Sequence, residues 1–266
     1  MPHFILVEGG LGAGKTLMAS VLAHYWRMKS GDEVRIFANY DLAGSTPFDS
    51  ANRWLEVADA RGSVIVWDEA QSQFDRRLWT RNTIATQIFN MTRKLRAVHI
   101  FVNPIGNHLD SRILDLVEVF IHVRKIPNRA ILLDLYEFQD KRFGDWGRFV
   151  RTLRIPWHKV RQIFSLELYD TDQMLYPFPQ PKTEREQTEL LTKIADRQRE
   201  AAIRERQGIE MGGNHHGWLN PSDHKREKDV QREREDVPDR STSTLLPLSE
   251  YVSSNLVAKS EPLVRS

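Results

Sequence analysis

The octapeptide GGLGAGKT near the start of the chain has the residue types and spacing of a phosphate-binding loop, because residues 9–16 fit the pattern G-x-x-x-x-G-K-[ST]. Glycines let the backbone curl so that successive amide N–H groups face an anion. A helix that begins near Gly14 adds its positive N-terminal end. Lys15 offers a cation to the β- and γ-phosphates, and the Thr16 hydroxyl offers a ligand to Mg²⁺. The alternative is an ordinary glycine-rich turn followed by a lysine, with no role in phosphate binding.

We therefore predict that this loop binds ATP together with Mg²⁺. The predicted nucleotide-binding residues are Gly9, Gly10, Leu11, Gly12, Ala13, Gly14, Lys15, Thr16 and Leu17.

Two adjacent acids, Asp68 and Glu69, follow the apolar run 64–67. An aspartate at the tip of a buried strand beside the first strand can hold Mg²⁺ through water, so we predict Thr16 and Asp68 as the metal-binding pair. Glu69 is placed to accept a proton from an attacking water. Two alternatives stay open: Asp68 caps the next helix, or the site binds nucleotide without hydrolysing it.

Asn103 ends the run VHIFVN, and we expect it to contact the γ-phosphate or the attacking water, in a catalytic set with Lys15 and Glu69. The alternative is a turn with Pro104. If subunits form a ring, an arginine finger should supply further positive charge to the transferring phosphoryl group. The candidates, among which the sequence does not choose, are Arg76, Arg77, Arg81, Arg93 and Arg112.

The segment 141–164 interleaves basic and aromatic residues. Its large rings are Phe143, Trp146, Phe149, Trp157 and Phe164. Cations neutralise phosphates and exposed rings stack on unpaired bases, which would suit a nucleic acid. The other interpretation is an amphipathic edge whose aromatics belong to the core, and the sequence leaves both open.

The elements that must position these residues alternate between strands and helices. Strands are expected at 4–8, 34–39, 63–68, 98–103, 119–124 and 131–138, with a further candidate at 165–169; helices are expected at 14–30, 48–60, 80–95 and 109–117. The last two strands of the main series can form a hairpin through Pro127-Asn128. Such alternation predicts a mostly parallel sheet between helices. With the phosphate loop, the predicted fold is an α/β P-loop NTPase of the RecA-like, additional-strand type.

The composition changes after the proline-rich run 176–181. We expect a P-loop ATPase domain over residues 1–178, a charged helix over 182–207, and a polar, disordered tail over 208–266. His215, His216 and His224 lie in that tail, so no metal site is expected there. The chain has no cysteine, which excludes a disulfide scaffold, a cysteine zinc site and a thiol nucleophile. No apolar stretch approaches the roughly twenty residues of a membrane-spanning helix.

Beyond the generic loop, two motifs are more specific, Asp68-Glu69-Ala70-Gln71 and Tyr169-Asp170-Thr171, and the run HLDSRILDLVEVFIHVRK at 108–125 lies between them. With the loop and VHIFVNP, they make residues 3–175 resemble the N-terminal domain of the zonular occludens toxin (Zot) family. These are assembly ATPases of filamentous phages, related to the FtsK/HerA group of DNA-translocating ATPases.

The resemblance implies ATP hydrolysis at Lys15, Thr16, Asp68 and Glu69, and a homo-oligomeric ring. It also implies envelope or virion assembly proteins as partners and DNA, single-stranded rather than duplex, as cargo. The expected location is the cytoplasm of a bacterial host, peripheral to the inner membrane through a partner. Many family members carry a transmembrane helix after the ATPase domain, whereas a charged segment follows here. A soluble motor that packages double-stranded DNA and a non-motor ATP-dependent switch therefore remain alternatives.

Overall fold

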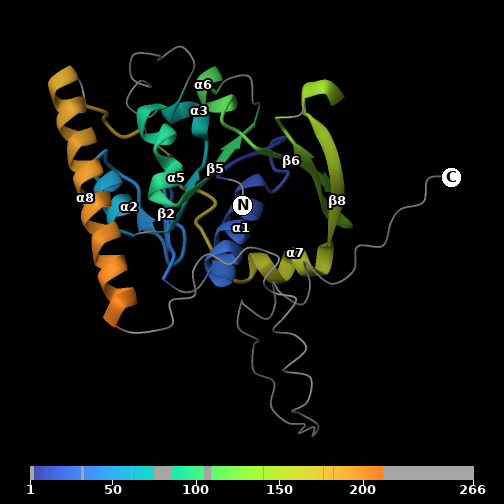
Figure 1. Ribbon diagram of the computed structural model, residues 1–266. Coiled ribbons are helices and arrows are strands. Elements are labelled where there is room, and N and C mark those ends of the chain that lie inside the picture. Colours follow the sequence, from blue (N-terminus) through green and yellow to red (C-terminus); the bar gives the residue numbers. More distant parts are fainter. Residues whose placement is uncertain are drawn as a thin grey trace, which may run out of the picture.

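A computed structural model describes residues 3–30, 33–60, 62–74, 86–104, 109–139, 141–175, 177–181 and 183–211. Eight strands in this part of the chain form one sheet in the order β3-β2-β4-β5-β1-β6-β7-β8 (Figure 1). Their bounds are β1 Phe4–Gly9, β2 Arg35–Ala38, β3 Thr46–Pro47, β4 Ser63–Trp67, β5 Ala97–Asn103, β6 Val119–Ile126, β7 Ala130–Glu137 and β8 Arg148–Pro156.

The strand pairing confirms the predicted fold class. Strands β3 to β6 in the sheet order are parallel to one another, and β7 and β8 extend the sheet with antiparallel pairs. Strand β5 lies between β1 and β4, which is the additional-strand arrangement of P-loop NTPases. Asp68 follows β4, which was expected directly beside the first strand, β1. This expectation is wrong, because β5 lies between β4 and β1. The β6–β7 hairpin turns as expected, with Asn128 at φ 54°.

Helices cover both faces of the sheet. Their bounds are α1 Lys15–Ser30, α2 Arg53–Ala60, α3 Ala70–Gln73, α5 Thr92–Leu95, α6 Ser111–Leu114, α7 Trp157–Phe164 and α8 Glu184–Met211, with a 3-10 turn, η3, at Lys141–Phe143. Side chains of α1 and α7 pack on one face, and those of α2, α3, α5, α6 and α8 belong to the core on the other.

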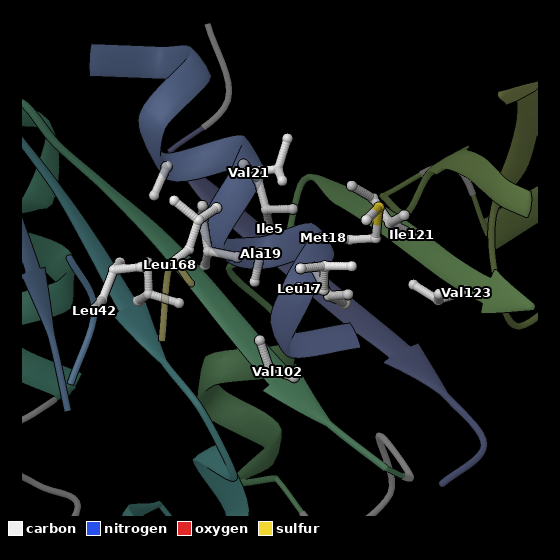
Figure 2. Close-up of a cluster of buried hydrophobic side chains, with 14 of the residues drawn as sticks. Ile5, Leu17, Met18, Ala19, Val21, Leu42, Val102, Ile121, Val123 and Leu168 are labelled. Carbon is white, nitrogen blue, oxygen red and sulfur yellow. The ribbon is translucent and has the colours of Figure 1, made fainter. Parts of the chain in front are cut away.

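The core on the α1 face is largely aliphatic, and Figure 2 shows Met18 of α1 beside Ile121 of the sheet. The central parallel strands are buried on both sides, which explains their nearly continuous apolar sequences.

The core on the other face is aromatic and holds one buried histidine, His99. The Trp67 indole N–H donates to its Nδ1 at 3.3 Å, so the remaining ring N–H at Nε2 faces Thr92 Oγ1 at 3.1 Å. Phe4 and Phe101 stack on the imidazole. Burial lowers the pKa of His99 to about 3, so the ring is neutral at physiological pH.

Helix α8 spans most of the segment 182–207, where a charged helix is expected. Its Leu190 and Ile194 are buried in the aromatic core, beside α2. Arg197 and Arg204 donate to the two carboxylate oxygens of Asp59 at the end of α2, at 2.6 and 3.3 Å. No helix in the described ranges is both long and apolar enough to cross a bilayer. Residues 212–266, with the three tail histidines, lie outside those ranges.

Three segments of the chain differ from the sequence expectation. Residues 165–169 form only an isolated bridge between Leu42 and Tyr169, with no strand. The segment 141–164 contains β8 and α7, neither of which was expected. The helix expected at 80–95 is helical at 86–90, turns at Met91 and resumes as α5, while residues 80–85 lie outside the described part.

Candidate nucleotide-binding site

The predicted phosphate loop connects β1 to α1 at the carboxyl edge of the parallel strands. Gly9 ends β1 against β6, where a Cβ atom would lie 2.3 Å from the carbonyl oxygen of Val123, so no larger residue fits. Gly14 has φ +93°, which disfavours any side chain. The Met18 N–H donates to the Gly14 carbonyl at 3.0 Å, so the helix begins directly after the loop. Its first amides therefore face the loop, where an anion can bind.

Lys15 lies against this loop. Its ammonium donates to the Gly10 carbonyl at 3.0 Å. Burial lowers the pKa of Lys15, and the nearby negative charges of Asp68, Glu69 and Glu8 oppose that shift. The Lys15 amino group is thus held beside the loop and close to three carboxylates.

The side chains predicted to bind Mg²⁺ are in direct contact. The Thr16 hydroxyl donates to Asp68 Oδ2 at 3.0 Å, although β5 lies between β1, which leads into the loop, and β4, which Asp68 follows. The other carboxylate oxygen, Oδ1, accepts the Glu69 N–H at 3.0 Å. Burial raises the pKa of Asp68, and the bond from Thr16 opposes the rise. A hydroxyl and a carboxylate are hard oxygen donors, and Mg²⁺ usually takes one or two protein oxygens besides phosphates and water, so this pair fits the ion. Among the described residues, no cluster of three or more His, Asp or Glu side chains could hold a metal ion.

Asn39, directly after β2, holds the backbone of Asp68 at two points. Its Nδ2 donates to the Asp68 carbonyl at 2.8 Å, and its Oδ1 accepts the Asp68 N–H at 2.7 Å. The sequence prediction did not include Asn39 in the site. The available signal was its place at the end of a predicted strand, since β2 and β4 are neighbours and their carboxyl ends meet at the same edge.

A second set of hydroxyl groups fixes the first turn of α1. The Ser20 hydroxyl donates to the Thr16 carbonyl at 2.8 Å, so the Tyr40 hydroxyl, 2.8 Å from Ser20 Oγ, must donate to Ser20. The Tyr169 ring contacts that of Tyr40 edge to face, with centroids 6.0 Å apart. Burial, aided by the charge of Asp68, raises the pKa of Tyr169, so both Tyr40 and Tyr169 stay protonated near neutral pH. The motif at 169–172 thereby lies close to the site.

Glu69 and Asn103 lie at the same edge of the sheet as the loop. Glu69 is exposed and has the left-handed backbone of φ 46° and ψ 47° at the start of α3. Such a conformation costs a non-glycine residue about 1–3 kcal/mol and concentrates at functional sites. Asn103 is fully buried at the tip of β5, where it is in register with Glu8 of β1.

The other predicted residues differ in their positions. The Leu17 side chain is fully buried in the core (Figure 2), so only its backbone can face a phosphate, whereas Leu11 is 92% exposed. Arg93 is exposed on α5. Arg112 is bound to the N-cap residue of α6, Asp110, with Nη2 at 2.7 Å from Oδ2. Arg76, Arg77 and Arg81 lie outside the described residues.

No protein-family model and no curated protein match this sequence. Among solved structures, it is similar to the N-terminal domain of zonular occludens toxin from Neisseria meningitidis, with 17% identity, 64% of this chain and 100% of that chain covered, and a TM-score of 0.48. It is also similar to the genome packaging NTPase B204 of Sulfolobus turreted icosahedral virus 2, solved with AMPPCP, with 11% identity, 51% and 92% covered, and a TM-score of 0.36. Both TM-scores lie below 0.5, so function has to be inferred from this chain's own residues.

Proposed function

We propose that this chain binds and hydrolyses ATP in the presence of Mg²⁺. The observation that carries the proposal is the contact of the Thr16 hydroxyl with Asp68 at 3.0 Å, beside a lysine that lies against the glycine loop. An ordinary glycine-rich turn followed by a lysine would not explain this contact. Asp68 comes from β4, two positions away from β1 in the sheet, and still contacts Thr16, the residue after Lys15.

Each residue then has a distinct role. The loop amides and Lys15 bind the phosphates, and Thr16 and Asp68 hold Mg²⁺, which neutralises charge that develops on the transferring phosphoryl group. Glu69 orients the attacking water and accepts its proton, and Asn103 contacts that water or the γ-phosphate. Because Asn39 fixes the backbone of Asp68, it is a positioning residue.

We further propose that hydrolysis drives the movement of viral DNA during virion assembly. Support for this step comes from the motifs at 68–71, 108–125 and 169–172, which resemble the Zot family. In such a motor the subunits would form a ring with an arginine supplied between neighbours. The protein would work in the cytoplasm of a bacterial host and act on envelope or virion assembly proteins.

Two substitutions test the proposal. Lys15→Ala should weaken binding of a fluorescent ATP analogue by at least about tenfold, since a phosphate-binding cation is lost. Glu69→Gln should abolish phosphate release while affinity changes little. Glu33→Gln is the matched control, because Glu33 is exposed on a turn at the opposite edge of the sheet, before β2.

The two readouts separate the alternatives. Unchanged nucleotide affinity in Lys15→Ala would refute the phosphate-loop assignment. Tight binding by the wild-type chain without phosphate release, with and without DNA, would replace the motor by an ATP-dependent switch.

A further inference from the structure

The antiparallel end of the sheet carries an aromatic row on the face opposite α1 and α7. Directly opposed residues of antiparallel strands share a face, and the register aligns Phe120 of β6 with Tyr136 of β7 and Phe149 of β8. The Trp146 ring, from the turn before β8, lies over this row. It stacks on His122 with centroids 4.7 Å apart and contacts Phe120 at 5.3 Å.

The outer rings of this row are open to solvent. Trp146 is 42% exposed and Phe149 is 53% exposed. Helix α7 packs on the other face of the same strands, through Val160 and Ile163. In Figure 1, β8 and α8 lie at opposite ends of the sheet, so α8 does not cover these rings. Large exposed rings gathered on one face indicate a binding surface.

Basic side chains flank the rings. Arg124 lies two residues after His122 on β6, so both side chains are on the same face. Leu132 of β7 is paired with Arg124 on one side and with Arg154 of β8 on the other, so the two arginines share the aromatic face. An acid on this face, Asp134, accepts hydrogen bonds from Arg124 and Thr152, each at 2.6 Å, so the charge of Arg124 is paired with that of Asp134. Residues 119–161 contain ten Lys/Arg and four Asp/Glu, a net charge of +6, whereas the whole chain has +2. The positive charge is therefore concentrated in this part of the chain.

We propose that this face, with its rings Trp146 and Phe149 and its flanking Arg154, binds single-stranded nucleic acid. Unpaired bases stack on the two rings and a phosphate lies beside Arg154. A duplex presents no free base faces to the rings, so it gains only the electrostatic part. The proposal rests on the proposed function in one respect: it places the polymer that an ATP-driven motor would move.

The test is fluorescence anisotropy of a fluorescein-labelled oligothymidine of about twenty nucleotides, with the full chain and no ATP, against a hairpin duplex of the same length. Phe149→Ala should weaken single-strand binding by at least about fivefold, because one stacking platform is lost. Phe164→Ala is its control: that phenylalanine is 46% exposed, on the helix that covers the other face.

A second pair of variants tests the charge. Arg154→Gln should weaken binding and lower the slope of log affinity against log salt by about one, as expected for one lost phosphate contact. Arg35→Gln, at an exposed position at the start of β2, should leave both unchanged. Thermal unfolding of each variant establishes that it is folded. If Phe149→Ala does not fold, the arginine pair decides.

Equal affinity for single strand and duplex would overturn the proposal, as would equal binding by each variant and its control. Sedimentation that shows weaker self-association of Phe149→Ala with unchanged oligonucleotide binding would make the face a subunit interface instead. Because no ATP is present, a protein that fails to hydrolyse ATP but binds the oligonucleotide refutes the proposed function and leaves this inference standing.

Discussion

Replacing Asn39 by alanine removes both hydrogen bonds that hold the backbone of Asp68, at 2.7 and 2.8 Å. A typical hydrogen bond contributes about 1 kcal/mol net, so the two together amount to about 2 kcal/mol of the free energy of unfolding. For a domain of this size that loss lowers the melting temperature by about 4–8 °C. Urea unfolding should show a lower midpoint with an unchanged slope. Asn90→Ala, at an exposed position, should change the unfolding free energy by less than about 0.5 kcal/mol.

The same change should act on turnover more than on nucleotide affinity. Asp68 loses its placement relative to Thr16, whereas the loop and Lys15 are untouched. We expect kcat to fall by about tenfold or more, because small displacements in an active site are costly, and the Kd for ATP to change much less. The reasoning is refuted if Asn39→Ala matches Asn90→Ala in stability, or if kcat is unchanged well below the melting temperature.

Asn39→Asp separates the hydrogen bonds from the charge. Its carboxylate still accepts the Asp68 N–H, but its second oxygen faces the Asp68 carbonyl and adds a negative charge beside a buried acid. That environment raises the pKa of the new carboxyl in the folded state. The neutral carboxyl therefore contributes to the free energy of unfolding below its pKa in the unfolded chain, about 4, and this contribution is lost as the pH rises. At pH 7 this variant should be less stable than Asn39→Ala, and equal stability at pH 7 would contradict the geometry.

Three further predictions concern the fold around the site. Gly9→Ala places a Cβ atom 2.3 Å from the Val123 carbonyl oxygen, so soluble yield and ATP binding should both fall; a stable, ATP-binding variant would show that β6 can move away. Because His99 has a folded pKa of about 3, its imidazole is protonated in the unfolded chain at a higher pH than in the folded protein. The free energy of unfolding should therefore fall by about 1.4 kcal/mol per pH unit as the pH drops from about 6.5 to 3. Urea titrations of His99→Gln should lack this part of the pH dependence. Ile194→Ala, at a fully buried position of α8, should cost about 2–5 kcal/mol in chemical unfolding, whereas Ile203→Ala, 46% exposed on the same helix, should cost far less.

Two kinds of site residue could be predicted from the sequence. They are residues within a contiguous motif and residues at the end of a predicted strand. The loop 9–16 is contiguous, so its glycines, lysine and threonine are recognisable without tertiary information. Asp68 could be placed near Thr16 because parallel strands present their carboxyl ends at one edge. Asn39 was missed because an asparagine after a strand is as often a turn residue, and only the pairing of β2 with β4 gives it a partner.

Strand β8 was missed for a different reason. Its arginines at 148, 151 and 154 recur every third residue, which masks the alternation expected of a strand. The register shifts opposite Leu135 and Tyr136, so Val150 is an extra residue in β8. A bulge of this kind breaks the period of two, and no sequence periodicity reveals it before the pairing with β7 is known.

The same bulge affects how copies of this chain can come together. Strand β8 ends the sheet order, and a nine-residue outermost strand would ordinarily offer its amide and carbonyl groups to a strand from another molecule. Here the bulge bends β8, and its exposed guanidinium groups repel the same strand of a second copy. Pro156 also has no backbone N–H to donate. We therefore expect assemblies of this chain to grow through packed side chains and not by annealing sheet to sheet, which also protects a concentrated protein against fibrous aggregation.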